Sequence, residues 1–234
     1  MKAAFLLHGF ATDINDYSSI IPFLKKRYDA IFLESLPGHG LNASLSDFTT
    51  TNVFEYINRK YDEIKLKYDC IDLYGYSMGG ALATYLASRN KVNKLVLLAP
   101  ANKYINARIF ASRLKKEIDL ISNGEMERHS NITENDKRSI NVMFQDLIPR
   151  YNVNTISTFI SIVRVCNEEL KENNTKTLLV RGDLDELVPS SSSEYLKKYF
   201  KNMEEVIIPD LGHLMLRSSH YRLIINEIKK YIDE

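Results

Sequence analysis

The sequence predicts an α/β protein with a doubly wound, mainly parallel sheet of about six strands and a helical cap inserted between the fourth and fifth strands. Three observations indicate this class. Short apolar runs such as Ala3–Leu7 lack the alternation of a half-exposed strand, which is typical of parallel strands buried on both faces. Segments with apolar residues at helical spacing separate these runs, as in parallel sheets. The alternation stops after residue 101 and resumes after residue 175.

The expected elements follow one another in a regular order. We expect strands at Ala3–Leu7, Ala30–Leu33, Ile71–Tyr74, Lys94–Leu98, Thr177–Val180 and Glu205–Ile208. The first helices are expected at Asp16–Arg27, residues 50–67 and Met78–Ser88. After the break, four serines at 190–193 offer N-caps for a helix that runs to Tyr199, and an apolar stripe from Tyr221 to Ile232 predicts the closing helix.

Residues 102–174 are predicted to form the cap, and residues 1–101 and 175–234 the core. A structureless loop of this length is implausible in a compact domain, and three apolar stripes indicate helices instead. The stripes are Phe110, Leu114, Ile118 and Ile121; Ile140, Met143, Phe144 and Leu147; and Ile156, Phe159, Ile160 and Val163. We expect the cap to cover the carboxyl edge of the sheet, where open α/β sheets bind ligands. The residues expected to line the substrate pocket are Phe110, Met143, Phe144 and Phe159. The alternative is a helical layer with no role in substrate choice.

Composition narrows the class of function. The chain has 234 residues, of which 44% are hydrophobic and 26% charged, as expected of one globular domain. A net charge of +1 argues against nucleic acid as a partner, and no apolar run is long enough to span a membrane. The apolar N-terminus is too short for a signal peptide, so a cytoplasmic location is expected. No metal-binding or nucleotide-binding motif is present, and no cofactor is expected. The oligomeric state is left open.

The motif Gly75-x-Ser77-x-Gly79 lies between an expected strand and an expected helix. A strand that turns sharply into a helix holds its turn residue, here Ser77, in a strained conformation. The flanking glycines let the strand and the helix approach each other. The Ser77 hydroxyl should therefore project at the carboxyl edge of the sheet, beside the free N–H groups of the helix N-terminus. A glycine-rich turn with a capping serine is the alternative, but the strand–helix context favours a nucleophile.

Two later loops supply the partners that a serine nucleophile needs. A serine hydroxyl requires a neighbouring base, and the base requires a third group that fixes its tautomer. Asp183 and Asp185 follow one buried strand, and His213 follows the next. His213 is the predicted base. Asp185 is favoured as the acid because it lies farther along its loop and can turn toward His213, with Asp183 as the alternative.

An oxyanion also needs N–H donors. Met78, the residue after the serine, should supply one from the start of its helix, and Phe10 should supply the second because Gly9 lets the backbone come close. His8 and His39 precede the serine in loops, and we expect them to make structural hydrogen bonds.

These motifs resemble the α/β-hydrolase superfamily, and most of all its carboxylesterase and monoacylglycerol-lipase branch. They are His8-Gly9-Phe10, Pro37-Gly38-His39-Gly40, Gly75-Tyr76-Ser77-Met78-Gly79-Gly80, Gly182-x-x-Asp185-x-x-Val188-Pro189 and Gly212-His213, in the order of that superfamily. The resemblance implies a catalytic triad of Ser77, Asp185 and His213, with oxyanion amides at Phe10 and Met78.

The expected function is therefore hydrolysis of a small carboxylic ester with an apolar, short-to-medium acyl group through an acyl-enzyme. Two other functions remain open. The menaquinone-pathway synthase that eliminates pyruvate has a similar elbow, but it usually carries an arginine where this chain has Ala81, which favours an uncharged ester. A non-catalytic receptor on the same scaffold has no need of all these parts together.

Overall fold

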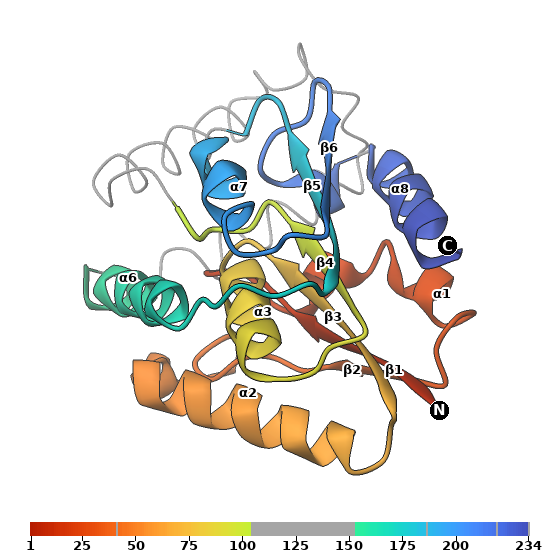
Figure 1. Ribbon diagram of the computed structural model, residues 1–234. Coiled ribbons are helices and arrows are strands. Elements are labelled where there is room, and N and C mark those ends of the chain that lie inside the picture. The colour runs from red at the N-terminus through yellow and green to blue at the C-terminus, as the bar shows by residue number, and fades with distance from the viewer. Residues whose placement is uncertain (41, 104–152, 186, 219, 234) are drawn as a thin grey trace.

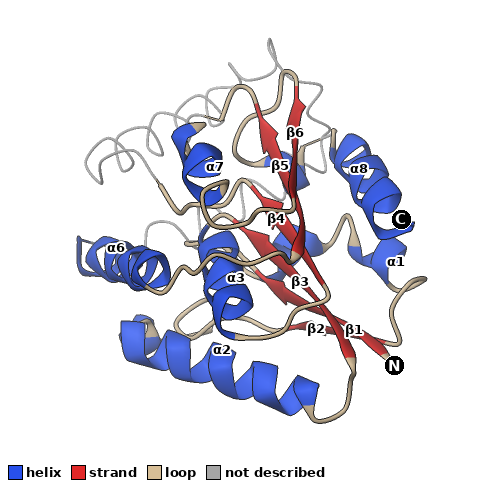
Figure 2. Ribbon diagram, in the orientation of Figure 1, coloured by secondary structure: helices blue, strands red, loops and turns tan. Residues whose placement is uncertain are grey.

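Six parallel strands form one sheet with helices on both faces (Figures 1 and 2). The computed structural model describes residues 1–40, 42–103, 153–185, 187–218 and 220–233. The strands lie in the order β2-β1-β3-β4-β5-β6. Their bounds are β1 Lys2–Leu7, β2 Ala30–Leu33, β3 Cys70–Tyr76, β4 Lys94–Leu98, β5 Lys176–Gly182 and β6 Met203–Ile208. All pairings among them are parallel, so the carboxyl ends of the strands share one edge. The predicted fold class is confirmed.

Helices cover the two faces of the sheet unequally (Figure 1). One face carries α2 Thr50–Lys65, α3 Met78–Arg89, α6 Val153–Glu168 and α7 Ser191–Leu196. The other face carries α1 Ile21–Leu24 and α8 Tyr221–Asp233. The loops within the described residues contain the short 3-10 helices η1 Ile14–Tyr17, η2 Leu45–Asp47 and η6 Met215–Arg217. Each face of the sheet therefore packs against its own apolar cluster.

The amphipathic helices bury the residues that their spacing selects. In α2 the buried side chains are Val53, Ile57, Tyr61 and Ile64, as the helical spacing predicts. In α8, Ile224 and Ile228 are fully buried, and Tyr231 joins them. Within the described residues, no helix combines the length and apolarity that crossing a membrane would require.

Two expected helices are shorter than predicted. The expected helix Asp16–Arg27 is instead η1 followed by α1, because Pro22 lacks an N–H and its ring would clash with the carbonyl of Ser18 in a continuous helix. Pro22 sits in the first turn of α1, where both defects are harmless. The helix expected to run to Tyr199 ends at Leu196, and Ser190 makes no side-chain capping bond.

The third helix expected in the cap is α6. Its residues Phe159, Ile162 and Val163 are buried in the same apolar cluster as α2 and α3, and it lies beside α3 (Figure 1). The other two expected cap helices, with Phe110, Met143 and Phe144, lie outside the described residues. The division of the chain into a core and a cap at 102–174 stays a prediction.

Candidate active site

Ser77 occupies a strained turn between β3 and α3. Its backbone has φ 54° and ψ −118°, a conformation that L-residues rarely adopt. The glycines around it are required by close packing: a Cβ on Gly75 would lie 2.3 Å from the Gly79 carbonyl oxygen, and a Cβ on Gly79 would lie 2.0 Å from the carbonyl oxygen of Leu7. The strand, the helix and the end of β1 therefore meet without intervening side chains, which is the geometry of a nucleophile elbow.

Ser77, His213 and Asp185 form one chain of hydrogen bonds. The His213 Nε2 atom lies 2.9 Å from Ser77 Oγ, and His213 Nδ1 lies 2.9 Å from Asp185 Oδ2 and 3.1 Å from Oδ1. The imidazole side chain is 5% exposed and the Asp185 side chain 3%. The three residues are 136 and 28 positions apart in the chain, and the structure brings them together at the carboxyl edge.

Asp185 faces His213 because two loops pack closely. A Cβ on Gly182 would lie 1.7 Å from the carbonyl oxygen of Leu211, so only glycine lets the end of β5 approach the loop that carries His213. The Leu184 amide donates to the same Leu211 oxygen. Asp183, the alternative acid, is exposed, whereas Asp185 turns inward. Asp185, and not Asp183, is therefore the carboxylate that contacts His213.

Hydrogen bonds from the backbone hold the Asp185 carboxylate. Its Oδ1 atom accepts from the amides of Leu187 at 3.0 Å and Val188 at 2.8 Å. These bonds fix the rotamer of the carboxylate and leave Oδ2 for the imidazole.

Tyr76 is a contact that the sequence reasoning missed. Its hydroxyl donates to the carbonyl of His213 at 2.9 Å, and its ring stacks on the imidazole with a centroid distance of 5.5 Å. Tyr76 directly precedes Ser77, and the alternation of side chains along β3 places it on the face that carries the His213 loop. The alternation of side chains along the strand could have predicted that Tyr76 faces the His213 loop.

The two predicted oxyanion donors belong to segments that lie next to Ser77. The Met78 amide is the first of α3, and no hydrogen bond within the described part of the chain uses it. The loop that carries Phe10 passes next to the serine, since a Cβ on Gly9 would lie 3.3 Å from Ser77 Cβ. The role of these two amides as an oxyanion hole stays a prediction.

His8 and His39 have structural roles, as expected. His8 Nε2 accepts from the Leu36 amide at 2.9 Å, and its Nδ1 lies 2.8 Å from the Gly9 carbonyl oxygen. Burial lowers the pKa of His8, and burial together with the neighbouring His8 lowers the pKa of His39 to about 3. Both rings are neutral near pH 7, and His8 ties the loop after β2 to the loop that carries Phe10.

An aromatic cluster supports the ring of Phe10. Phe159 stacks on it with a centroid distance of 5.0 Å, and Phe48 lies 5.6 Å away on the loop before α2. Phe159 is 2% exposed and Phe48 3%. Of the four residues expected to line the substrate pocket, Phe159 is the one inside the described residues, and it contacts the predicted oxyanion loop. Phe48 was not predicted, because it lies in a segment without periodicity.

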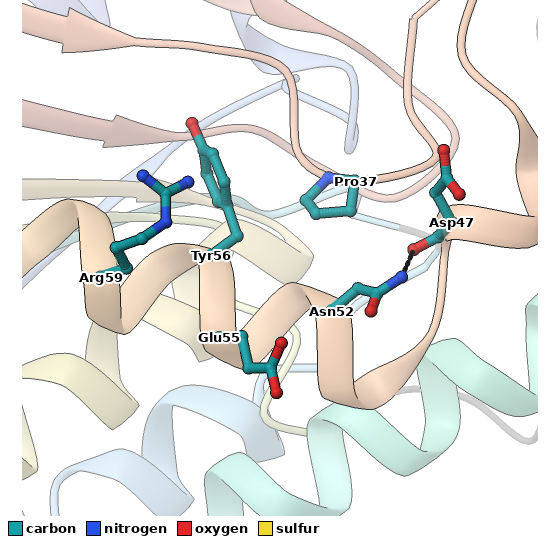
Figure 3. Close-up of a pocket in the computed structure, with 6 residues that line it drawn as sticks. All are labelled: Pro37, Asp47, Asn52, Glu55, Tyr56 and Arg59. Atoms are coloured by element: carbon teal, nitrogen blue, oxygen red, sulfur yellow. Dashed lines mark hydrogen bonds between the residues drawn. The ribbon is translucent and has the colours of Figure 1, made fainter.

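A surface depression lies at α2 (Figure 3). It is an open groove of about 600 Å³ lined by Pro37, Asp47, Asn52, Glu55, Tyr56 and Arg59. The groove includes no member of the Ser77 chain of hydrogen bonds. In the part of the chain that the structure describes, no group of three or more His, Cys, Asp or Glu side chains is arranged to hold a metal ion.

A family model described as "alpha/beta hydrolase fold" matches residues 5–217. This match covers most of the chain and includes the elbow, the acid loop and the histidine loop. The chain belongs to the alpha/beta hydrolase fold family.

Similar proteins include esterases and lipases. The chain is 24% identical to "Putative esterase/lipase 2" of Mycoplasma genitalium over 97% of this chain and 87% of that protein. It is also 24% identical to a "Pimeloyl-[acyl-carrier protein] methyl ester esterase" of Legionella pneumophila, covering 97% and 93% of the two chains. A solved esterase of Exiguobacterium antarcticum has a TM-score of 0.76 at 18% identity, with 100% of this chain and 92% of that chain covered. Together with the family match, these similarities support a hydrolase of the esterase and lipase type.

Proposed function

We propose that this protein is a serine esterase that cleaves carboxylic esters with an apolar, short-to-medium acyl group. The observation that carries the proposal is the unbroken chain of hydrogen bonds from Ser77 Oγ through His213 to Asp185. A free serine hydroxyl is a poor nucleophile at neutral pH, and this arrangement is the one that activates it.

The proposed reaction has two half-reactions. Ser77 Oγ attacks the ester carbonyl while His213 Nε2 accepts the hydroxyl proton, and the resulting oxyanion is stabilised by the amides of Met78 and Phe10. The imidazolium then gives the proton to the departing alkoxide, which leaves an acyl-enzyme. Water attacks the acyl carbonyl while His213 Nε2 accepts one of its protons. The imidazolium then returns that proton to Ser77 Oγ as the acyl–Oγ bond breaks, and the carboxylic acid departs. Asp185 stabilises the imidazolium throughout and holds Nδ1 protonated when the ring is neutral.

The acyl preference rests on the apolar surroundings. The Phe10 ring lies among Phe48 and Phe159, and no charged residue belongs to that cluster as described. Ala81, where the pyruvate-eliminating synthase usually has an arginine, is fully buried in α3. The names of the relatives from Mycoplasma genitalium and Legionella pneumophila also favour an ester substrate.

A panel of p-nitrophenyl esters of graded acyl length tests the proposal, with monoacylglycerols and a methyl pimelate ester as additional arms. We expect kcat/KM to rise roughly fourfold for each acyl methylene that is buried on binding, and to level off once further methylenes stay exposed. The matched control is Ser77→Ala, which should lose turnover with every ester.

Other outcomes would reject the proposal. If the purified protein ignores every ester yet eliminates pyruvate from the succinylated dicarboxylate precursor of the menaquinone pathway, the esterase proposal is wrong. If it does neither but binds a small apolar ligand, a receptor function replaces it.

A further inference from the structure

A buried ion pair connects two loops of the candidate site. Arg217 Nε and Nη2 each lie 2.9 Å from Asp16 Oδ1, and Arg217 Nη2 lies 3.8 Å from Asp13 Oδ1. The side chains of Asp16 and Arg217 are 1% and 7% exposed. Asp16 Oδ2 accepts no hydrogen bond within the described part of the chain. The buried charge of Asp16 is therefore balanced through its other oxygen, by Arg217.

On one side the pair is joined rigidly to His213. Arg217 is the last residue of η6, and a turn connects it to His213. Two backbone hydrogen bonds close this turn, from Met215 N to His213 O at 2.7 Å and from Arg217 N to Leu214 O at 3.0 Å. Met215 is fully buried. A displacement of the guanidinium therefore moves the backbone that carries the imidazole.

On the other side the pair is joined to the loop that carries Phe10. Asp16 lies in η1, and the next residue, Tyr17, donates from its hydroxyl to the Leu7 carbonyl at the end of β1 at 2.9 Å. The Thr12 hydroxyl donates to the Gly9 carbonyl at 3.0 Å. These bonds make the segment from β1 to η1 one closed loop beside Ser77.

We infer that Asp16 and Arg217 are positioning residues: their ion pair fixes the position of the His213 loop relative to the loop that carries Phe10. The inference rests on the proposed function. A second contact links the same loops, from Ser19 Oγ to the Leu216 carbonyl at 2.9 Å, but it is partly exposed and neutral. The buried ion pair supplies the directional constraint, because Arg217 presents two donors to one oxygen.

Positioning and electrostatic effects give different mutational patterns. Asp16→Leu removes a negative charge and Arg217→Met a positive one, so a direct effect of charge on His213 would have opposite signs in the two variants. A loss of positioning lowers kcat in both variants. It also makes the double variant no worse than either single variant, since each single change already breaks the pair.

The test measures kcat and KM with the best p-nitrophenyl ester, thermal unfolding, and the low-field proton NMR signal of the His213 Nδ1–H group. We expect both single variants and the double variant to lose about 10- to 100-fold in kcat with KM changed less than about twofold. Arg217→Lys keeps the charge but loses the two-donor fork, so its kcat should be intermediate. The NMR signal should broaden or shift in the same variants.

Asp72→Asn is the matched control. Asp72 is fully buried and pairs with Lys2 at 3.0 Å, but it lies near the amino end of β3, at the opposite end from Ser77. This variant should be less stable with kcat unchanged. If Arg217→Met or Asp16→Leu does not fold, Arg217→Lys decides the test, because it preserves the charge but not the two-donor contact.

Three results would overturn the inference: an unchanged kcat in folded Asp16→Leu, a kcat loss in Asp72→Asn of the same size, or additive effects in the double variant. If the wild-type protein hydrolyses no ester and does not react with a fluorophosphonate, the proposed function fails. The NMR signal then still decides whether the pair positions His213.

Discussion

Replacing Asp185 with Asn tests how the site fixes the tautomer of His213. The asparagine has nearly the shape of the aspartate, and its oxygen should stay with the amides of Leu187 and Val188, which lie 3.0 and 2.8 Å from Oδ1. Its NH2 group then takes the place of Oδ2, 2.9 Å from His213 Nδ1. Two donors cannot face each other, so Nδ1 becomes the acceptor and the proton moves to Nε2.

The magnitude follows from this inversion. With its proton on Nε2, the imidazole cannot accept the proton of Ser77, whose Oγ lies 2.9 Å away. We expect kcat to fall by about 10⁴, which corresponds to about 5 kcal/mol of lost transition-state stabilisation. The fold should persist, because the bonds to the two backbone amides are retained.

The assay is kcat/KM with a p-nitrophenyl ester, together with a thermal unfolding curve. The matched control is Asp183→Asn, which changes an exposed side chain in the same loop and should alter kcat less than about twofold. Equal losses in the two variants, or a larger loss at Asp183, would refute the reasoning.

Three further predictions concern the nucleophile, the base and the stability of the sheet edge. A fluorophosphonate probe should label Ser77, and labelling that persists in Ser77→Ala would show that another residue reacts. The kcat/KM value should rise with pH through one ionisation between about pH 5 and 8, because His213 must be neutral to accept a proton, and a flat profile would exclude it as the base. Burial favours protonated Glu205, but hydrogen bonds from Lys197 at 2.8 Å and Arg181 at 2.7 Å outweigh burial and lower its pKa to about 2. Glu205→Gln should therefore lower the free energy of unfolding at pH 7 by about 1 to 2 kcal/mol, allowing for solvent screening. In urea titrations the difference from wild type should disappear as the pH falls from about 4.5 to 2. A difference that persisted at pH 2 would contradict this assignment.

The sheet and the nucleophile elbow were predictable because local signals determine them. A buried parallel strand is apolar along its whole length, which the sequence shows directly. The elbow requires glycine at positions 75 and 79, because a Cβ there would clash with backbone atoms, and this spacing around Ser77 is visible in the sequence. The break before α1 was also predictable from the sequence, since Pro22 cannot continue a helix from Asp16. The apolar stripe there was given more weight than the proline.

Contacts between distant loops were not predictable in the same way. Arg217 and Asp16 are 201 positions apart, and each alone reads as an ordinary polar loop residue. Their pairing depends on how two loops fold back over the edge of the sheet. The position of α6 also depends on tertiary packing. Its apolar stripe predicts a helix, but the stripe does not say that this helix lies against α3.

The backbone conformations at the carboxyl edge bear on how the protein would respond to selection for heat resistance. Besides Ser77, the non-glycine residues with positive φ are Ala11, Ala99 and Asp210, among the described residues, and each follows the end of a strand. A left-handed conformation costs roughly 1 to 2 kcal/mol at such a residue, so replacement by glycine would relieve steric strain at the expense of a more flexible unfolded chain. Directed evolution for a higher melting temperature should therefore find substitutions at this edge, and subsequent selection for turnover should reverse them, because the turns that cost stability are the ones that hold the reacting groups in place.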